Sequence, residues 1–308
     1  MNLKKMLKCA AGITLIAGIT AGCGGAVGGG SGVAYLNFDD NDTFIKLIET
    51  EFEKSAQSQS LNVKFYDAKG DINLQVDQMN EALASGVKSI VLIAADGDLI
   101  VPSVEHANAQ GITVITLNRD INGGEKVKVS SDDYEAGKLQ GDYLSKTLPQ
   151  GANVVYLEGT STQSGAVKRW EGFKASCLDK RGDIQLLDMQ DGNYSKTEAM
   201  KIMALWLELF PKIDAVVCGN DQMALGAVAA LKKAGRLAGC QVSGVDAVDD
   251  ALKAVASGEM VQTIKQDAVK QAQGAAELAA TVEKGGKPAD VTVPFLSITK
   301  ENVAQFLK

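Results

Sequence analysis

Residues 213–227 read IDAVVCGNDQMALGA, and this stretch decides the fold. It begins with a short apolar run rich in β-branched residues, turns through Gly219, Asn220 and Asp221, and continues with the spacing of an amphipathic helix. A short apolar run that leads directly into a helix is typical of a strand buried on both faces of a parallel sheet. The stretch therefore predicts one strand-to-helix unit of an α/β protein.

Three further apolar runs end in planar polar side chains in the same way. They are Val33–Phe38 before Asp39, Asp40 and Asn41, Ile112–Leu117 before Asn118, Arg119 and Asp120, and Gln241–Val245 before Asp246. Ligands of parallel sheets bind at the carboxyl ends of the strands. Carboxylate, amide and guanidinium groups gathered there can form paired hydrogen bonds to neighbouring hydroxyls of a small polyol. The pattern therefore predicts a sugar-binding site.

Strand and helix patterns alternate along the chain and fall into two similar series. We expect two Rossmann-like lobes, each a doubly wound parallel sheet. The chain has only 5 prolines and no long Ser-rich linker, so short segments are expected to cross between the lobes and form a hinge. The expected division is 33–131 with 267–296 for the N-terminal lobe, and 132–266 with 297–308 for the C-terminal lobe.

The first residues have the pattern of an export signal. Basic residues precede an apolar stretch over 9–19 that is too short to span a bilayer, and small residues precede Cys23. The pattern before Cys23 resembles a bacterial lipobox, although Thr20 stands where leucine is usual. We expect a signal peptide over 1–22, acylation of Cys23 and a glycine-rich tether over 23–32. A plain signal peptide with an incidental cysteine is the alternative.

Composition limits the possible partners and chemistry. The formal net charge of -7 and the 5% aromatic content disfavour nucleic-acid binding. The single histidine, His106, lies in a polar helical stretch and is expected at the surface. The loop 159–165 lacks the serine spacing of a hydrolase elbow, and no second histidine is present to act as a base. We therefore expect a protein that is not an enzyme and that has no cofactor and no metal site.

The three cysteines that follow Cys23 are expected to be free, mostly buried thiols. They are Cys177, Cys218 and Cys240, and because their number is odd, they cannot all form disulfides with one another. A bridge from Cys218, near the end of one strand, to Cys240, at the start of the next, would be out of register. The cysteines therefore predict no disulfide framework.

Four side chains near the predicted strand ends have competing interpretations. Asp221 is expected to cap its helix, which leaves Asn220 to face the cleft. Asp246 is expected to need a partner, either Arg169 or a ligand, because a buried unpaired carboxylate is costly. Trp170 could pack in the core or line the cleft, and its helical spacing with Phe173 favours the core.

Several segments together resemble periplasmic sugar-binding proteins of the ribose and galactose/glucose group, which serve ABC importers. The resemblance covers essentially 33–308, and it is carried by 116–120, 131–143, 169–173, 220–231 and 244–252. It implies two lobes that close on a monosaccharide. With the expected export signal, it also implies a lipid-anchored receptor in the bacterial cell envelope, on the periplasmic or extracellular face.

Matching this sequence to the family's motifs gives a set of expected ligand contacts. Phe44 and Tyr194 are expected to pack on the apolar faces of a sugar ring, and the polar groups are expected to hold its hydroxyls. The complete expected set is Asp40, Asn41, Phe44, Asn118, Arg119, Arg169, Tyr194, Asn220, Asp246 and Gln266.

The sequence also departs from the family in ways that bear on the ligand. Ala94 stands where ribose and galactose binders carry an asparagine, and Gly165 stands where the galactose binder has a carboxylate. The link over 146–152 leaves no room for the calcium loop of the galactose branch, so no structural calcium is expected.

The expected function is capture of a monosaccharide and its delivery to an ABC importer permease. Asp40 with Asn118 favours a hexose such as galactose or glucose, whereas Arg119 with Arg169 resembles the ribose branch. Ribose, another pentose and myo-inositol are therefore alternative ligands. Docking on a chemoreceptor or sensor kinase is the alternative to import.

Overall fold

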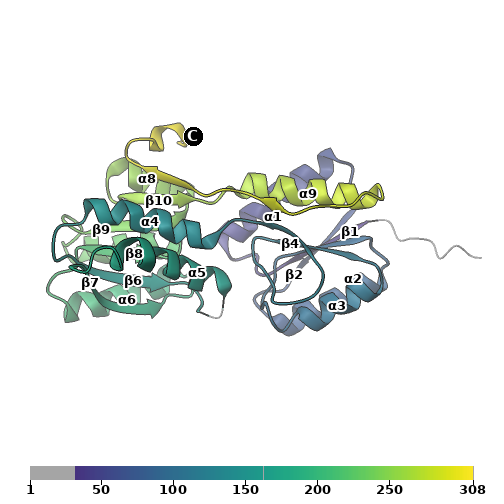
Figure 1. Ribbon diagram of the computed structural model, residues 1–308, viewed down its shortest axis with the longest axis horizontal. Coiled ribbons are helices and arrows are strands. Elements are labelled where there is room, and N and C mark those ends of the chain that lie inside the picture. Colours follow the sequence, from purple (N-terminus) through teal and green to yellow (C-terminus); the bar gives the residue numbers. More distant parts are fainter. Residues whose placement is uncertain (1–31, 162, 308) are drawn as a thin grey trace, which may run out of the picture.

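The computed structural model of the chain describes residues 32–161 and 163–307. The expected signal peptide, the acylation of Cys23 and the tether up to residue 31 lie outside the described residues. Two α/β lobes lie side by side along the long axis of the molecule (Figure 1). No helix in the described ranges is long and apolar enough to cross a membrane.

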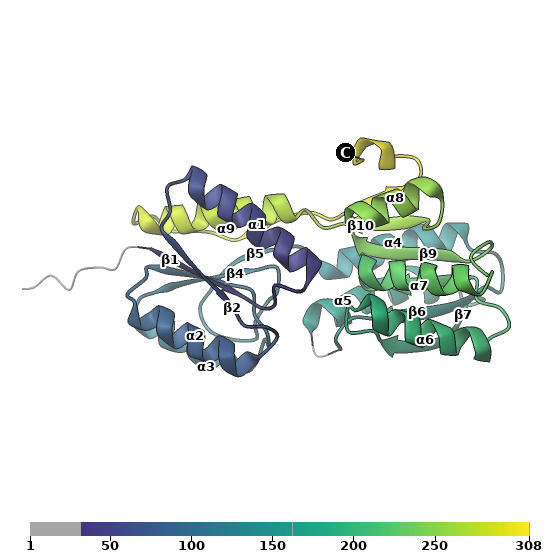
Figure 2. The ribbon, with the colours of Figure 1, turned by 180° about the vertical axis from the view of Figure 1, so that it is seen from behind.

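The N-terminal lobe is a six-stranded, fully parallel sheet with the strand order β11-β5-β4-β3-β1-β2. Helices α1 and α9 cover one face of this sheet, and α2 and α3 cover the other, as Figure 2 shows. The strands are β1 (Val33–Asn37), β2 (Val63–Asp67), β3 (Ser89–Leu92), β4 (Thr113–Leu117), β5 (Val127–Ser130) and β11 (Val291–Thr292). The helices are α1 (Thr43–Ser58), α2 (Ile72–Ala84), α3 (Val101–Ala109) and α9 (Ala268–Glu283).

The C-terminal lobe repeats this plan with the strand order β12-β10-β9-β8-β6-β7, in which only the edge strand β12 is antiparallel. Its strands are β6 (Asn153–Glu158), β7 (Gln185–Asp191), β8 (Ala215–Cys218), β9 (Gln241–Asp246), β10 (Gln262–Lys265) and β12 (Leu296–Thr299). Its α-helices are α4 (Asp133–Thr147), α5 (Ser164–Phe173), α6 (Lys196–Leu209), α7 (Asp221–Lys233) and α8 (Asp249–Ser257). A π-helical turn (Lys174–Leu178) extends α5, and a 3-10 turn (Val303–Gln305) follows β12. The predicted fold of two parallel α/β lobes is confirmed.

Each lobe is held by two apolar layers, one on each face of its sheet. On α1, Phe44, Ile45, Ile48 and Phe52 are buried against the strands, and the spacing of one, four and eight residues puts them on one helix face. The central strands β1, β3 and β8 are buried along their whole length, as their unbroken apolar runs predict. The carboxyl ends of the strands are thereby held in a fixed array.

The chain passes between the lobes three times, always through a short segment. The first passage joins β5 to α4, the second joins β10 to α9, and the third joins β11 to β12. Both views show these segments running together between the lobes (Figures 1 and 2). Short parallel connections of this kind let two rigid lobes move about a common hinge.

Helices α4 and α5 of the C-terminal lobe approach each other closely, and glycine is required where they meet. A Cβ atom at Gly137 would lie 1.8 Å from the backbone oxygen of Arg169, and one at Gly172 would lie 2.0 Å from the backbone oxygen of Tyr134. These distances are far below van der Waals contact, so no side chain fits at either position. The close packing fixes the position of α5, which carries Arg169.

Gly137→Ala is expected to destabilise the protein and to displace α5. The added methyl group meets backbone rather than a flexible side chain, so the two helices must separate, at a cost of about 1–3 kcal/mol or more. Urea unfolding measures this loss. Gly182→Ala is the matched control, because a Cβ atom there meets nothing within 4 Å. Equal stability of the two variants would contradict the packing argument.

Candidate functional site

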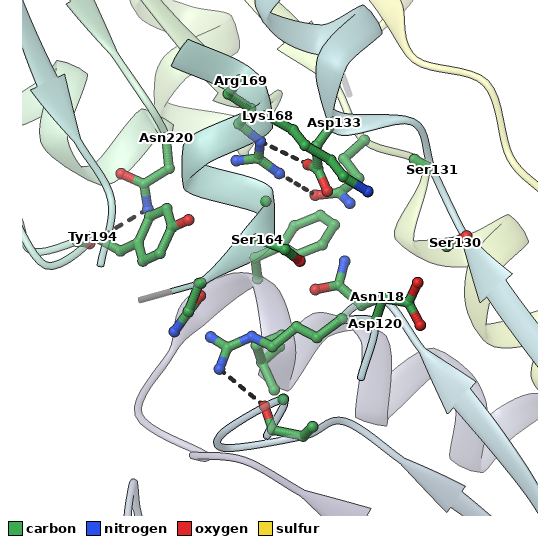
Figure 3. A pocket seen from close by; sticks show the side chains of 18 of the residues that line it. Asn118, Asp120, Ser130, Ser131, Asp133, Ser164, Lys168, Arg169, Tyr194 and Asn220 are labelled. Atoms are coloured by element: carbon green, nitrogen blue, oxygen red, sulfur yellow. Dashed lines mark hydrogen bonds and ion pairs between the residues drawn. The ribbon is translucent and has the colours of Figure 1, made fainter. Parts of the chain in front are cut away.

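A cleft between the lobes is lined by polar side chains from the strand ends and from the first turns of α4 and α5. Figure 3 shows Asn118 and Asp120 on one side of it, across from Arg169, Tyr194 and Asn220. Its volume is about 1110 Å³, counting the solvent at its mouth. The expected contacts that line the cleft are Phe44, Asn118, Arg119, Arg169, Tyr194, Asn220, Asp246 and Gln266.

The structure places Asp40 and Asn41 away from the cleft lining. The Asp40 carboxylate accepts a hydrogen bond of 2.6 Å from Asn37 Nδ2 and one of 2.8 Å from Lys46 Nζ. The Asn41 amide donates to Asp39 Oδ1 at 2.8 Å and is exposed. The chain turns here, and the next residue, Asp42, lines the cleft and caps α1 through the backbone nitrogens of its first turn. These local contacts hold the Asp40 and Asn41 side chains at the turn, outside the residues that line the cleft, and their predicted ligand contacts stay predictions.

Arg169 provides a fixed positive charge on the C-terminal lobe's side of the cleft. Its Nε donates to Asp133 Oδ1 at 2.8 Å, its Nη1 to the backbone oxygen of Gly219 at 2.6 Å, and its Nη2 to Gln266 Oε1 at 3.4 Å. Burial acts to lower the pKa of Arg169, but the nearby Asp133, Tyr194 and Asp246 raise it above its usual range. The guanidinium is therefore charged and held in one orientation.

Asp246 ends β9 in a strained conformation. Its φ is 123°, a region that favours glycine, and the following Ala247 has φ 60°. Its carboxylate is buried, and no side chain of the described residues donates a hydrogen bond to it. Burial raises the pKa of Asp246 well above its ordinary value, and the neighbouring Asp221 acts in the same direction while Arg169 opposes it. The carboxylate therefore faces the cleft without a side-chain donor.

Asn220, rather than the predicted Asp221, caps its helix. Asn220 is the cap of α7, because its Oδ1 accepts from the backbone nitrogen of Met223 at 2.9 Å. Its Nδ2 donates to the backbone oxygen of Tyr194 at 3.3 Å. Asp221 is the first residue of α7 and is fully buried, where it accepts from Thr263 Oγ1 at 2.8 Å and from the backbone nitrogen of Val248 at 3.0 Å. Asn220 still lines the cleft.

Asp221 is expected to make the protein less stable as the pH rises toward neutrality. Burial raises the pKa of its carboxyl from 3.8 to about 7. The folded state therefore binds more protons than the unfolded state between these values, so the contribution of Asp221 to stability is complete below 3.8 and falls until about pH 7. Chemical unfolding of Asp221→Asn across this pH range should show a flatter profile than the unsubstituted protein. If the free energies of unfolding of both proteins changed with pH in the same way, the raised pKa of Asp221 would be contradicted.

Arg119 and Asn118 occupy the opposite side of the cleft, at the end of β4. The Arg119 guanidinium stacks 3.9 Å above the centroid of the Phe38 ring, and its Nη1 donates to the backbone oxygen of Ala94 at 3.3 Å. Burial lowers the pKa of Arg119, and Asp42 opposes this effect. Asn118 has a left-handed φ of 67°, and its backbone nitrogen donates to Val129 O at 2.9 Å. Both polar groups are therefore presented to the cleft from a rigid turn.

Two aromatic rings complete the lining. Phe44 comes from the first turn of α1, and Tyr194 comes from the turn after β7, where its φ is 53°. A Cβ atom at Gly159 would lie 2.0 Å from Tyr194 Cζ, so glycine at this position makes room for the ring. Burial raises the pKa of Tyr194 to about 12, so the hydroxyl stays neutral and can donate.

The structure adds cleft residues that sequence reasoning missed. Asp133 holds Arg169, and Asp42, Ser131 and Lys168 line the cleft. Asp42 directly follows the predicted Asn41. Lys168 precedes Arg169 in the sequence, but a single lysine in a helix gives no signal of its own.

The remaining side chains with open interpretations lie outside the cleft. Trp170 packs edge-on against Tyr156, with ring centroids 4.9 Å apart, and belongs to the core beneath α4 and α5. His106 is exposed on α3. The prediction that Cys177, Cys218 and Cys240 are free and buried is confirmed. Among the residues that the structure describes, no group of three or more His, Cys, Asp or Glu side chains could hold a metal ion.

A two-lobed α/β protein whose interlobe cleft combines fixed charges, amides and two aromatic rings is a solute-binding protein. The chain belongs to the family described as periplasmic binding protein domain, whose sequence profile matches residues 33–287. Members of this family bind solutes and are not enzymes, in agreement with the prediction from the sequence.

Several relatives of the chain are named for the sugar or polyol that they bind. It is 30% identical to the ribose import binding protein of Salmonella typhimurium over 93% of this chain and 95% of that protein. It is 31% identical to the xylitol-binding protein of Mycolicibacterium smegmatis over 86% of this chain and 76% of that protein. A solved ABC transporter solute binding protein from Bacillus halodurans with bound myo-inositol superposes with a TM-score of 0.86 and 28% identity, covering 90% and 98% of the two chains.

Proposed function

We propose that this protein is an extracytoplasmic receptor that captures a pentose, a pentitol or an inositol and delivers it to an ABC importer. The single observation that carries the proposal is one cleft that brings together Arg119 of the N-terminal lobe, Arg169 of the C-terminal lobe and the carboxylate of Asp246, to which no described side chain donates. Guanidinium groups donate in pairs to neighbouring hydroxyl oxygens, and a carboxylate accepts from hydroxyls. A ring or chain with several adjacent hydroxyls satisfies both.

The ligands of the three relatives described above support a polyol smaller or more symmetric than the expected hexose. Their names give ribose, xylitol and myo-inositol as ligands. The chain itself has Ala94 at the cleft, which removes the side-chain amide that ribose and galactose binders carry there. Two aromatic rings, Phe44 and Tyr194, are available to cover the apolar faces of a sugar or cyclitol ring.

A thermal-shift screen tests the proposal directly. The mature protein is mixed with pentoses, pentitols, inositols, hexoses and, as negative controls, amino acids, and hits are followed by calorimetry. A ligand at 100 times its dissociation constant stabilises the native state by about 2.7 kcal/mol, which raises the melting temperature by about 5 °C or more. We expect a pentose, a pentitol or an inositol to give the largest shift. A shift with hexoses alone would restore the hexose prediction, and no shift with any polyol would overturn the proposal.

The expected lipid anchor is part of the proposal and has its own test. Acylation of the Cys23 thiol would tether the receptor to a membrane through the glycine-rich segment. Mass spectrometry of the N-terminal peptide from bacterial membranes should show a diacylglyceryl group on Cys23, and Cys23→Ala should release the protein from the membrane. An unmodified Cys23 in membrane-free protein would contradict the anchor.

A further inference from the structure

A fully buried glutamine, Gln271, connects the cleft to the hinge. It lies in the first turn of α9, just after the second passage between the lobes, and its side chain is 0% exposed. Its Oε1 accepts from Asn118 Nδ2 at 3.2 Å, and its Nε2 donates to Ser131 Oγ at 2.9 Å. Asn118 and Ser131 both line the cleft, and Ser131 belongs to the first passage between the lobes. One buried amide therefore joins two hinge segments and a candidate ligand contact.

The direction of these two hydrogen bonds determines what Asn118 offers to a ligand. Because Asn118 Nδ2 points to Gln271 Oε1, the Asn118 Oδ1 remains available as an acceptor. The backbone of Asn118 is fixed by the hydrogen bond from its nitrogen to Val129 O. The side-chain amide can still turn over on this fixed backbone, and its orientation therefore depends on Gln271. If the Gln271 amide were turned over, Ser131 would donate to Oε1, Nε2 would donate to Asn118 Oδ1, and Asn118 would offer a donor instead.

We propose that Gln271 is a positioning residue that fixes Asn118 as a hydrogen-bond acceptor for a ligand hydroxyl and ties this contact to the hinge. The proposal rests on the proposed function and deepens it, because it assigns the polarity of one ligand contact. A ligand hydroxyl that donates to Asn118 extends a chain of hydrogen bonds through Gln271 to Ser131, and such chains strengthen one another in a buried site. A ligand with only an acceptor at this position is selected against.

Two substitutions separate positioning from simple packing. Gln271→Met preserves the length and shape of the side chain but removes both polar atoms, so Asn118 loses its orienting partner. Gln271→Glu is the matched control. A carboxyl group buried at this position is neutral in mildly acidic buffer, so it can accept from Asn118 and donate to Ser131 as the glutamine does.

Calorimetric titration with myo-inositol and with D-ribose measures the effect on binding. We expect Gln271→Met to weaken binding by about tenfold, the equivalent of one lost hydrogen bond, and Gln271→Glu to stay within about threefold of the unsubstituted protein at mildly acidic pH. Should Gln271→Met fail to fold, Ser131→Ala removes the other end of the chain and is expected to weaken binding in the same direction. A stable Gln271→Met variant with unchanged affinity would overturn the proposal.

An NMR comparison of ligand-free protein distinguishes this proposal from the proposed function. The side-chain amide signals of Asn118, assigned by their loss in Asn118→Asp, should exchange slowly with solvent in the unsubstituted protein and in Gln271→Glu, and fast in Gln271→Met. If the side-chain amide of Asn118 exchanged with solvent at the same rate in all three proteins, the positioning role of Gln271 would be overturned. If the unsubstituted protein bound no polyol, the proposed function would fail, and the exchange data would decide the positioning role without it.

Discussion

Arg169→Ala is expected to abolish high-affinity binding and to destabilise the protein, and this is the largest effect that the structure predicts. We expect an affinity loss of at least about 30-fold, or about 2 kcal/mol, because a hydrogen-bonded charge in the cleft is removed. We also expect a loss of about 3–5 kcal/mol in the free energy of unfolding, the usual cost of removing one partner of a buried ion pair.

The two effects have different causes in the structure. The side chains of Arg169 and Asp133 are only 9% and 16% exposed, so the substitution leaves Asp133 without its cation in a poorly hydrated place. The backbone oxygen of Gly219 and the amide of Gln266 lose their donor as well. The loss of affinity comes from the guanidinium itself, because alanine has no group that can donate a hydrogen bond to a ligand hydroxyl.

Calorimetry of binding and urea unfolding measure the two losses separately. Lys168→Ala is the matched control, since Lys168 is the adjacent residue, lines the same cleft and is exposed, with no ion pair to another described residue. It should leave the free energy of unfolding nearly unchanged. Arg169→Ala protein that folded and bound its ligand with wild-type affinity would remove Arg169 from the site.

Asp246→Asn is expected to weaken binding strongly and yet to stabilise the ligand-free protein. The carboxylate is buried without a side-chain donor and lies near Asp221, so its charge opposes folding. Asparagine keeps the shape and removes the charge. We expect the melting temperature without ligand to rise by about 2–4 °C, the equivalent of about 1 kcal/mol, and the affinity for a polyol to fall by about 30-fold.

The stabilisation that Asp246→Asn gives to the ligand-free protein is expected to depend on pH. Because the pKa of Asp246 is raised in the folded state, the unsubstituted protein loses stability as the pH rises, and the variant lacks this loss. The stabilisation by Asp246→Asn should therefore be larger in basic than in acidic buffer. Asp249→Asn, an exposed aspartate at the start of α8, should change neither stability nor affinity in this way. A destabilised Asp246→Asn variant would show that the protein itself compensates the charge.

The lobes could be predicted from the sequence because parallel strands buried on both faces have unbroken apolar runs. The runs over 33–38, 112–117 and 213–218 correspond to β1, β4 and β8. The sequence predicts no strand at the short edge strand β11 or at the antiparallel β12. Strands of two and four residues at a sheet edge, of which the second is half exposed, have too little apolar pattern to be recognised.

The cleft residues at strand ends could also be predicted, whereas those placed by turns and helix packing could not. Arg119 and Gln266 lie within two residues after β4 and β10, Asp246 is the last residue of β9, and all three line the cleft. Asp40 and Asn41 also follow a strand, but the turn that leads into α1 gives the cleft to Asp42 instead. The return of 267–296 to the N-terminal lobe is expected from the sequence, but no local pattern shows that Gln271 contacts Asn118 and Ser131 there.

The return of α9 to the N-terminal lobe affects the order in which the two lobes can fold during synthesis. Helix α9 and strand β11 come after nearly the whole C-terminal lobe in the sequence, but they cover and extend the sheet of the N-terminal lobe. During synthesis, α1 can cover only part of the apolar side chains of β1, β3 and β4 on that face, and the rest stay uncovered until residues 268–292 have been made. The N-terminal lobe, which begins first, is therefore completed only after most of the C-terminal lobe has been made, and a chain cut after residue 266 would contain no finished N-terminal lobe.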